Sequence, residues 1–305
     1  MDIDHRLQRL RFGDLSLLVA LAETGSLRQA AGRVGRSQPA LSKALKDIED
    51  AFGVALFTRS PSGLELTTAG ARLIPDAELL LAELVNARDA ARTSRSAPLR
   101  IGCTPFMALV LMPRLLKAMP ETQIVLSEGA VPDLLDALGR GRVDAILVNY
   151  PDGDVPGDAF THVQLFKEPL LIVASRQQRP GRSWAALSRA DWVLPPRHSV
   201  IRRAIEARFL AEGLMPPVPK IESVNLGTNL RLIAAGLAIG AVPKSALDLD
   251  SGERRLRIVG VSPHLEIPPL SLVYRRSAER HPRLALLRAK LDGLASGTAR
   301  GKRIE

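Results

Sequence analysis

Cysteine is almost absent from this sequence, which has 305 residues and one cysteine, Cys103. A single cysteine excludes a disulfide within the chain and a metal site built from several cysteines. The five histidines are scattered, and none has the His-x-x-x-His spacing of metal ligands on a helix. We therefore expect no structural metal, no two-cysteine redox switch and no cofactor.

Long apolar runs are missing as well. No stretch of about 18 residues is apolar enough to span a bilayer, and the start, "MDIDHRLQRLRFGDLSLL", lacks the apolar segment of a secretory signal. The hydrophobic content of 46% is nevertheless enough to bury a core in each of two or three domains. We expect a folded cytoplasmic protein with no membrane partner.

The common catalytic motifs are also lacking. The sequence contains no G-x-S-x-G, no G-x-x-x-x-G-K-[ST] and no His/Cys metal spacing. Asp144, in "GRVDAIL", lies at the start of a predicted strand and is interpreted as structural. These absences argue against an enzyme.

The net charge of +10 does not by itself locate a nucleic-acid-binding region. Residues 1–97 hold 13 Lys and Arg against 12 Asp and Glu, whereas residues 98–305 hold 29 against 20. Phosphate attraction is screened over roughly 8 Å at physiological salt, so local clustering matters more than the total. Such a cluster lies in residues 26–57, where no acid precedes Asp47.

The spacing in this cluster predicts a helix, a short turn and a second helix. The first apolar stripe is Leu27, Ala30, Ala31 and Val34, and the second is Leu41, Ala44, Leu45 and Ile48. Ser26 and Gln29 have the spacing of a capping box, Gly35 suits a helix end, and Ser37 is placed as the next N-cap.

The opposite face of the second helix carries groups that can contact bases and phosphates. These are Gln38, Ser42 and Lys46 at four-residue steps, with Lys43 beside them and Pro39 in the first turn. An ordinary solvent-exposed face is the alternative. The following "TRSPSGLELTTAG" predicts a hairpin turning at residues 61–63 and bearing Arg59, and a helix-turn-helix with such a wing is typical of DNA-binding domains.

The stretch "SLRQAAGRVGRSQPALSKALKDIEDAFGVALFTRSPSGLELTTAG" resembles the winged helix-turn-helix of LysR-type transcriptional regulators. The resemblance implies that Ser37, Gln38, Pro39, Ser42 and Lys43 meet the major groove and that Arg59 meets backbone or minor groove. Spacing and charge assign Arg28, Arg33, Arg36 and Lys46 to the same DNA-binding surface, with the three arginines on phosphates.

From Leu73 onward the chain predicts a long helix that forms dimers. Its apolar residues alternate steps of four and three, as in a coiled-coil seam: Leu73, Ala77, Leu80, Leu84, Ala87 and Ala91. A helix that packs on its own domain is the alternative. Pro75 predicts a bend near the start, and "TSRSAP" ends the helix before Pro98. The resemblance also implies dimerisation through this helix, a homotetramer, and contact with promoter DNA and RNA polymerase.

The remaining two thirds alternate strands and helices, which indicates an α/β fold. "LRIGC", "QIVLSEG" and "VDAILV" are apolar strands separated by helices, and a second such unit runs from "EPLLIVAS" to "LAIGAVP". "LSLVYRR" and the final helix are expected to return to the first unit. The layout resembles the periplasmic-binding-protein-like regulatory region of the LysR-type family, which has two subdomains and a cleft.

We therefore expect an α+β multi-domain chain. Residues 1–66 are the winged helix-turn-helix, 67–97 the linker helix and 98–305 the effector-binding region. Within that region we expect one subdomain at about 98–166 and 270–305, and the other at about 167–269.

Ligands of open α/β folds bind beyond the carboxyl ends of strands, near helix N-termini. The effector candidates at such positions are Thr104, Pro105, Ala130, Asn149, His198, Ser199, Arg202, Asn225 and Thr228. By resemblance, Thr104 stands where the family often has a hydroxyl, whereas Ala130 replaces a common Ser or Thr. We expect a small anionic metabolite, although Arg202 also suits a solvated helix position and His198 a plain loop.

Two alternatives stay open at this stage. Cys103, beside the expected cleft, suggests a redox-responsive regulator, but no neighbouring cation lowers its pKa, so a packed thiol at a strand end is the simpler interpretation. A cytoplasmic small-molecule-binding protein would share the cleft. It would have no use for the first 97 residues, which a transcription regulator explains.

Overall fold

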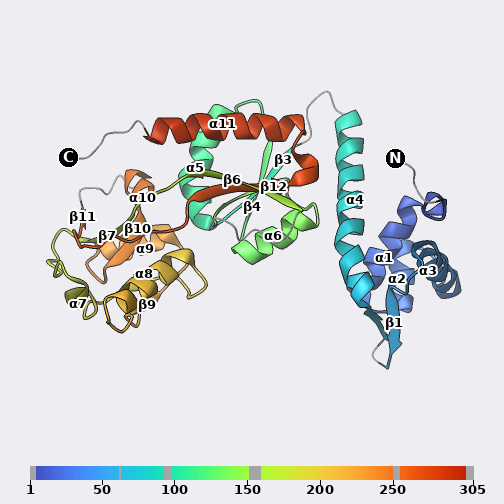
Figure 1. Ribbon diagram of the computed structural model, residues 1–305, viewed down its shortest axis with the longest axis horizontal. Coiled ribbons are helices and arrows are strands. Elements are labelled where there is room, and N and C mark those ends of the chain that lie inside the picture. The colour runs from blue at the N-terminus through green and yellow to red at the C-terminus, as the bar shows by residue number, and fades with distance from the viewer. Residues whose placement is uncertain (1–4, 62, 93–97, 151–158, 250–254, 300–305) are drawn as a thin grey trace. The chain divides into compact units, whose positions relative to one another are not determined.

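The computed structural model describes residues 5–61, 63–92, 98–150, 159–249 and 255–299 (Figure 1). They divide into two compact units. The first contains the residues up to Pro98 together with Leu135–Val143, and the second contains Leu99–Leu134 and the residues from Asp144 onward.

The first unit begins with a helical domain and a hairpin. A 3₁₀ turn (Leu7–Arg9) precedes α1 (Phe12–Thr24), α2 (Leu27–Val34) and α3 (Gln38–Phe52), which are followed by strands β1 (Phe57–Ser60) and β2 (Gly63–Leu66). The predicted helix-turn-helix and hairpin are thus confirmed. α1 was not expected, and it contributes Leu17, Leu18 and Leu21 to the core.

Local chemistry explains where these helices begin and end. Ser26 is the N-cap of α2, and its hydroxyl accepts a hydrogen bond from the backbone N–H of Gln29. Gly35 and Gly53 end α2 and α3 with φ values of +65° and +68°, which glycine adopts at low cost. Ser37 occupies the N-cap of α3, as predicted, but its side chain makes no capping hydrogen bond.

The hairpin packs closely against the end of α1. β1 and β2 pair antiparallel, with Ser60 opposite Gly63. The N–H of Leu64 donates to the carbonyl of Gly25 at 2.7 Å. Gly63 has a φ of +132°, and a Cβ added there would lie 2.4 Å from the same carbonyl oxygen, so only glycine fits this turn.

The long helix α4 (Thr68–Arg92) continues through Pro75, and the apolar residues of its first half are more buried than those of its second half. Ile74 and Ala77 are buried, so the alternative of packing on its own domain holds for the first turns. Further along, the side chains of Leu80 and Leu84 are 52% and 41% exposed. The predicted seam is therefore open only beyond Ala77, and the predicted helix end at residues 93–97 lies outside the described residues.

The second unit contains a five-stranded sheet in the order β4-β3-β5-β12-β6. The strands are β3 (Leu99–Cys103), β4 (Ile124–Glu128), β5 (Ala145–Asn149), β6 (Phe160–Phe166) and β12 (Leu270–Arg275). β3 pairs parallel with β4 and β5, as predicted, whereas β12 pairs antiparallel with β5 and β6. The predicted return of "LSLVYRR" to the first α/β unit is confirmed.

The strands of this sheet differ in burial. α5 (Pro105–Ala118) and α6 (Val131–Gly139) connect the parallel strands, and α11 (Pro282–Ala299) contacts α5. β5 lies inside the sheet and is buried throughout. β4, whose apolar sequence suggests burial, lies at the edge of the sheet and is mostly exposed.

A three-stranded sheet, β10-β7-β11, forms the other α/β layer. Its strands are β7 (Leu170–Ser175), β10 (Gly240–Pro243) and β11 (Leu256–Ile258), and both neighbours of β7 are antiparallel to it. The expectation that this region forms a second parallel α/β unit is therefore wrong for β7. Parallel pairing is found instead between β8 (Val193–Leu194) and β9 (Ile221–Glu222) and at the bridge Trp192↔Ile239. Ile239 directly precedes β10, which runs antiparallel to β7.

Four helices accompany this layer: α7 (Trp184–Leu187), α8 (Val200–Ala211), α9 (Leu226–Ala234) and α10 (Lys244–Leu249). A short 3₁₀ turn (Arg276–Ala278) follows β12. Phe209 of α8 meets the rings of Trp184 and Trp192 edge to face, at centroid distances of 5.2 and 6.0 Å. Such pairs add directional stabilisation to apolar burial, so α8 is held firmly against the sheet.

Candidate functional site

The second helix of the helix-turn-helix, α3, has one buried and one exposed face. Leu41, Leu45 and Ile48 have at most 8% of their surface exposed and pack into the core of the domain. The residues predicted to meet DNA lie on the other side, as the four-residue steps require. Ser37, Gln38, Pro39, Lys43 and Lys46 are exposed and Ser42 is half-buried.

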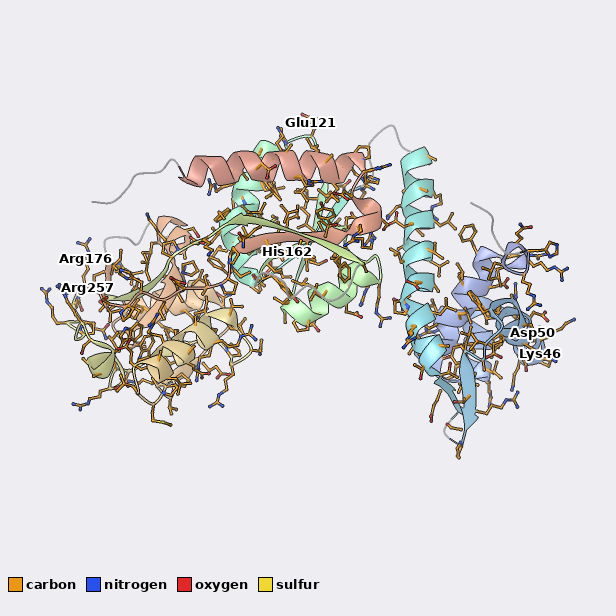
Figure 2. The ribbon with its side chains drawn as sticks, in the orientation of Figure 1. Lys46, Asp50, Glu121, His162, Arg176 and Arg257 are labelled. Carbon is orange, nitrogen blue, oxygen red and sulfur yellow. The ribbon has the colours of Figure 1, made fainter. Side chains whose placement is uncertain are left out.

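The exposed face of α3 combines an amide, hydroxyls and two cations. Such groups can make bidentate contacts with base edges and ionic contacts with phosphates. Lys46 and Asp50 lie one helical turn apart and are both exposed (Figure 2), as are Lys43 and Asp47, so each cation of this face is followed by an acid one turn later. Chemically, the face can bind a negatively charged, hydrogen-bonding surface.

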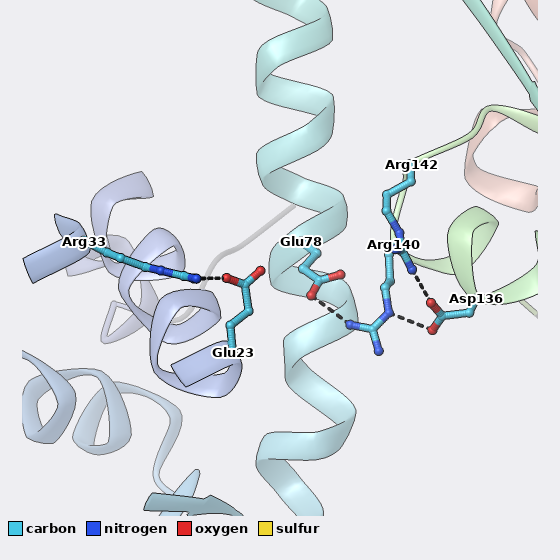
Figure 3. Close-up of polar contacts among 6 residues, drawn as sticks. All are labelled: Glu23, Arg33, Glu78, Asp136, Arg140 and Arg142. Atoms are coloured by element: carbon cyan, nitrogen blue, oxygen red, sulfur yellow. Dashed lines mark hydrogen bonds and ion pairs between the residues drawn. The ribbon is translucent and has the colours of Figure 1, made fainter. Parts of the chain in front are cut away.

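The surrounding arginines differ in their partners. Arg28 on α2 and Arg59 on β1 are exposed. Arg33 forms an ion pair with Glu23 of α1, which offsets part of its charge (Figure 3). Arg36 is exposed and lies near α1, since a Cβ built at Gly13 would be 3.9 Å from its Nη2. Both side chains of the Arg33–Glu23 pair are exposed, so the pair is weak and the other N–H groups of Arg33 stay accessible.

A second set of ion pairs lies in the same unit. Arg140 contacts the Glu78 carboxylate of α4 at 2.8 Å and the Asp136 carboxylate at 2.7 Å, and Asp136 also pairs with Arg142 (Figure 3). The two carboxylates raise the pKa of the Arg140 guanidinium. Arg140 thus joins Glu78 of α4 and Asp136 of α6 through ion pairs.

Glu49 is a positioning residue for which the sequence analysis assigned no role. Its Oε1 accepts hydrogen bonds from the backbone N–H groups of Leu56 and Phe57 at 2.7 and 3.1 Å. The carboxylate on α3 thereby fixes the first residues of the wing strand. The signal was present in the "IE…G..LF" spacing, but the spacing alone does not show which backbone groups the acid holds.

The effector candidates lie at strand ends and helix starts in the second unit. Thr104 is the N-cap of α5 and its side chain makes no capping hydrogen bond, while Pro105 is the first residue of that helix. Ala130 directly precedes α6. His198 is exposed beside Ser199, whose hydroxyl accepts from the N–H of Ile201 at 3.2 Å. The hydroxyl of Thr104 therefore remains available to a ligand.

Two candidates have protein partners instead. The Asn149 amide is buried and donates to the carbonyl of Pro268 at 2.9 Å. Arg202 is only 2% exposed, and its Nε lies 2.7 Å from a carboxylate oxygen of Glu206. Among the described residues, Nη1 of Arg202 is buried without a hydrogen-bond partner, so this guanidinium is only partly engaged by the fold.

The remaining candidates surround the start of α9. Asn225 is its N-cap and accepts a hydrogen bond from the N–H of Thr228 at 3.0 Å. Near them lies a small cavity of about 50 Å³, bordered by Phe106, Pro195, Ile201, Leu226 and Asn229. Phe106 follows Thr104 and Pro105, and Pro195 precedes the His198 loop, so the structure brings three of the predicted segments to one place.

Cys103 is fully buried at the end of β3. Burial, together with the Glu128 carboxylate on the adjacent strand, raises the pKa of its thiol to about 12. The thiolate is the reactive form, so this thiol is inert near neutral pH. This geometry argues against a redox sensor at Cys103.

Two negative observations concern the described residues only. Across residues 5–299, apart from the gaps given above, no helix is both long and apolar enough to cross a membrane. Within the same ranges, no group of three His, Cys, Asp or Glu side chains is arranged to hold a metal ion.

Comparison with protein families gives two matches that follow one another along the chain. Residues 12–71 match the model described as "Bacterial regulatory helix-turn-helix protein, lysR family". Residues 92–295 match the model described as "LysR substrate binding domain". The second match alone covers more than half of the 305 residues.

Known relatives are similar over nearly the whole chain. The HTH-type transcriptional regulator GbpR of Azospirillum brasilense is 29% identical, over 93% of this chain and 87% of its own. The DNA-binding transcriptional dual regulator OxyR of Escherichia coli is also 29% identical, over 92% and 95%. The crystal structure of ArgP from Mycobacterium tuberculosis has a TM-score of 0.73 at 20% identity, over 95% and 98%, and shows the same fold.

Proposed function

The chain belongs to the LysR family of bacterial transcriptional regulators, and on this premise we propose how it binds DNA and responds to a metabolite. It is a DNA-binding regulator with an effector-binding region, not an enzyme. We propose that residues 1–66 bind DNA, that residues 67–97 link two chains, and that residues 98–305 bind the effector. We also propose that the protein acts in the cytoplasm.

The DNA contact is proposed for the exposed face of α3. The observation that carries it is the division of this helix, which buries Leu41, Leu45 and Ile48 and exposes the polar side chains opposite. Gln38, Ser42 and Lys43, with Ser37 and Pro39 at the helix start, lie in the major groove of promoter DNA in this proposal. Arg59 on the wing and Arg28, Arg33, Arg36 and Lys46 contact the sugar-phosphate backbone.

We propose that two chains pair through α4. Leu80, Leu84, Ala87 and Ala91 follow one another at steps of four and three and are exposed, and an apolar seam of this kind is buried when two helices associate. A dimer places two copies of α3 at neighbouring half-sites, and a tetramer holds two such pairs. Contact with RNA polymerase belongs to the same proposal.

We propose that the effector is a small anion bound where α5, α8 and α9 begin. Helix N-termini favour negative charge, the Thr104 hydroxyl is not used in capping, and the exposed Arg197 and His198 lie in the loop before α8. Binding would alter the arrangement of the DNA-binding pairs in the oligomer and so the bending of promoter DNA. The Asn149 amide is bonded to the Pro268 carbonyl, whereas Arg202 pairs with Glu206 through Nε and keeps a buried Nη1 without a partner among the described residues.

Footprinting of the promoter next to the protein's own gene tests the DNA-binding proposal. Wild-type protein should protect two half-sites, and a panel of small carboxylic acids should change the protected length for at least one acid. Lys43→Gln should weaken protection. Lys117→Gln, which removes the same charge from an exposed position on α5, should leave it unchanged. Equal protection by both variants would contradict the role given to α3.

Calorimetry tests the proposed effector contact separately. An acid that changes the footprint should bind Thr104→Val at least about tenfold more weakly than wild type, because a hydrogen bond to a charged group contributes about 1.5–3 kcal/mol. Unchanged affinity would remove Thr104 from the site.

A further inference from the structure

Arginines gather at one end of the three-stranded sheet β10-β7-β11. The segment 176–190, which follows β7, holds four arginines and no Asp or Glu. Arg255 directly precedes β11 and Arg257 lies within it, and Figure 2 shows Arg176 and Arg257 close together. We call Arg176, Arg179, Arg255 and Arg257 the arginine patch. Its members are exposed except for Arg257, which is half-buried.

Strand pairing places two of these arginines directly opposite each other. β7 and β11 pair antiparallel, with Ser175 opposite Leu256. One residue further on, the backbone N–H of Arg176 donates to the carbonyl of Arg255 at 2.9 Å, and Arg257 is the diagonal neighbour. Like charges directly opposite on neighbouring strands destabilise a sheet. The arginine patch is therefore unfavourable for the fold itself, which is typical of a functional site.

The loop that carries the arginine patch is fixed by hydrogen bonds. The side-chain oxygen of Gln178 accepts from the N–H of Ser175 at 3.2 Å, and its Nε2 donates to the carbonyl of Gly236 at 2.9 Å. Nε of Arg176 donates to the carbonyl of Leu256 at 3.2 Å, which leaves the four N–H groups on its two Nη atoms for a partner. Groups that are fixed in advance lose less entropy when they bind.

The chemistry of this surface suits a phosphate backbone. Among the residues that the structure describes, no carboxylate forms an ion pair with a member of the arginine patch. The segment 176–183 holds three arginines, two glutamines and a serine, and it has no large apolar side chain. These residue types contact DNA phosphates, and interfaces with DNA are more polar and more positive than interfaces with proteins. Promoter DNA is also close at hand, because the same chain binds it through another domain.

We propose that the arginine patch binds the phosphate backbone of promoter DNA that flanks the sites contacted by α3. This inference goes beyond the DNA contact proposed above, because it gives the effector-binding region a direct and sequence-independent contact of its own. Guanidinium groups bind phosphates bidentately, so arginine suits this role better than lysine. Such contacts add salt-dependent affinity and stabilise a bent path of the flanking duplex.

Salt titrations of the full-length protein on a promoter fragment test the inference. One phosphate contact contributes about 0.9 to the slope of log Kobs against log salt. Replacing Arg176, Arg179 and Arg255 together by Gln should therefore reduce the slope by about 2.7 for each patch that contacts DNA. Between about 50 and 200 mM salt, the affinity of this variant should fall roughly 40-fold less than that of wild type.

The chain offers a matched control with the same loss of charge. Lys117, Arg231 and Arg280 are exposed at other places in the same unit, and their joint replacement by Gln should leave the slope as in wild type. Replacing the three patch arginines by Lys keeps the charge and should keep the slope. Thermal melts monitored by circular dichroism should show each variant to be folded. Arg179→Gln, outside the strand pairing, serves alone if the triple Gln variant is not, with a slope change of about 0.9.

Hydroxyl-radical footprinting on the same fragment locates the contact. The triple Gln variant should lose backbone protection outside the two half-sites and keep it inside them. An unchanged slope with both half-sites still protected would overturn the inference, and so would an equal loss of slope in the control. Unchanged DNA binding combined with loss of transcription by RNA polymerase would assign the arginine patch to a protein partner and overturn it as well. Absence of half-site protection by wild type would contradict the role of α3, whereas a slope difference between the two triple variants would still support the patch.

Discussion

Glu49→Ala should destabilise the DNA-binding domain through the wing. The Glu49 carboxylate accepts from the N–H groups of Leu56 and Phe57 at 2.7 and 3.1 Å, and these bonds are partly buried. A hydrogen bond to a charged group contributes about 1.5–3 kcal/mol, and two bonds to one carboxylate share its desolvation cost. We therefore expect a loss of about 2–4 kcal/mol in the free energy of unfolding.

The chain offers matched controls for this variant. Glu49→Gln keeps an Oε1 acceptor without the charge and should lose only about 1 kcal/mol. Asp50→Ala removes an acid from the next, exposed position of α3 and should change stability by less than about 0.5 kcal/mol.

Differential scanning calorimetry of the full-length protein measures the effect. In a domain of 60–100 residues, 1 kcal/mol corresponds to a Tm change of about 4–8 °C, so the transition of the N-terminal domain should fall by about 10 °C or more in Glu49→Ala. DNA affinity should fall as well, because β1 carries Arg59. If the Tm of Glu49→Ala lay within 2 °C of that of Asp50→Ala, the stabilising role of the two Glu49 hydrogen bonds would be refuted.

Three further predictions follow from single positions. Lys46→Gln should reduce the slope of log Kobs against log salt by about 0.9 in binding titrations, the value for one phosphate contact, whereas Lys117→Gln should leave the slope unchanged. Because burial raises the pKa of Cys103 from an ordinary 9.0 to about 12, its thiolate fraction at pH 8 is lower by about 10³. Reaction with a thiol reagent should be slower by this factor than in urea and should keep rising with pH up to about 12, whereas in urea it should level off near 9. Dilute peroxide should leave DNA binding unchanged. Gly63→Ala should cost about 1–3 kcal/mol in urea unfolding because of its φ of +132°, whereas Gly32→Ala, which meets nothing within 4 Å, should be neutral or stabilising.

Local periodicity predicted much of the DNA-binding domain. The stripes ending at Val34 and Ile48 form the inner faces of α2 and α3, and the Pro61 region turns between β1 and β2. These features depend on residues close in sequence, which is why they can be predicted. The role of Glu49 depends on backbone groups seven and eight residues away, and no side-chain pattern specifies them.

Strand direction in the C-terminal region was less predictable. The apolar runs "LLIVAS" and "GAVP" are strands as expected, but β7 and β10 pair antiparallel. Hydrophobicity reports burial and does not report which neighbour a strand pairs with. The same reason explains β4, whose apolar sequence predicted burial although it lies at a sheet edge.

The candidate effector site shows a similar limit. The topological rule placed Thr104, His198 and Asn225 at helix starts, where the structure has them. It could not show that Arg202 turns toward Glu206 or that the Asn229 side chain is buried with its Nδ2 on the Ser223 carbonyl. Side-chain direction depends on packing between segments, and only the folded chain specifies it.

The division of α4 limits the strength of any pairing between two copies. Because Ala77 is buried, the exposed seam runs from Leu80 to Ala91, which at 1.5 Å per residue is about 18 Å long. Two helices joined over three turns associate weakly, so a fragment ending at Arg92 should exchange between free and paired chains as its concentration changes. Each half-site would then be occupied independently at low protein concentration, and coordinated occupancy would require the rest of the molecule.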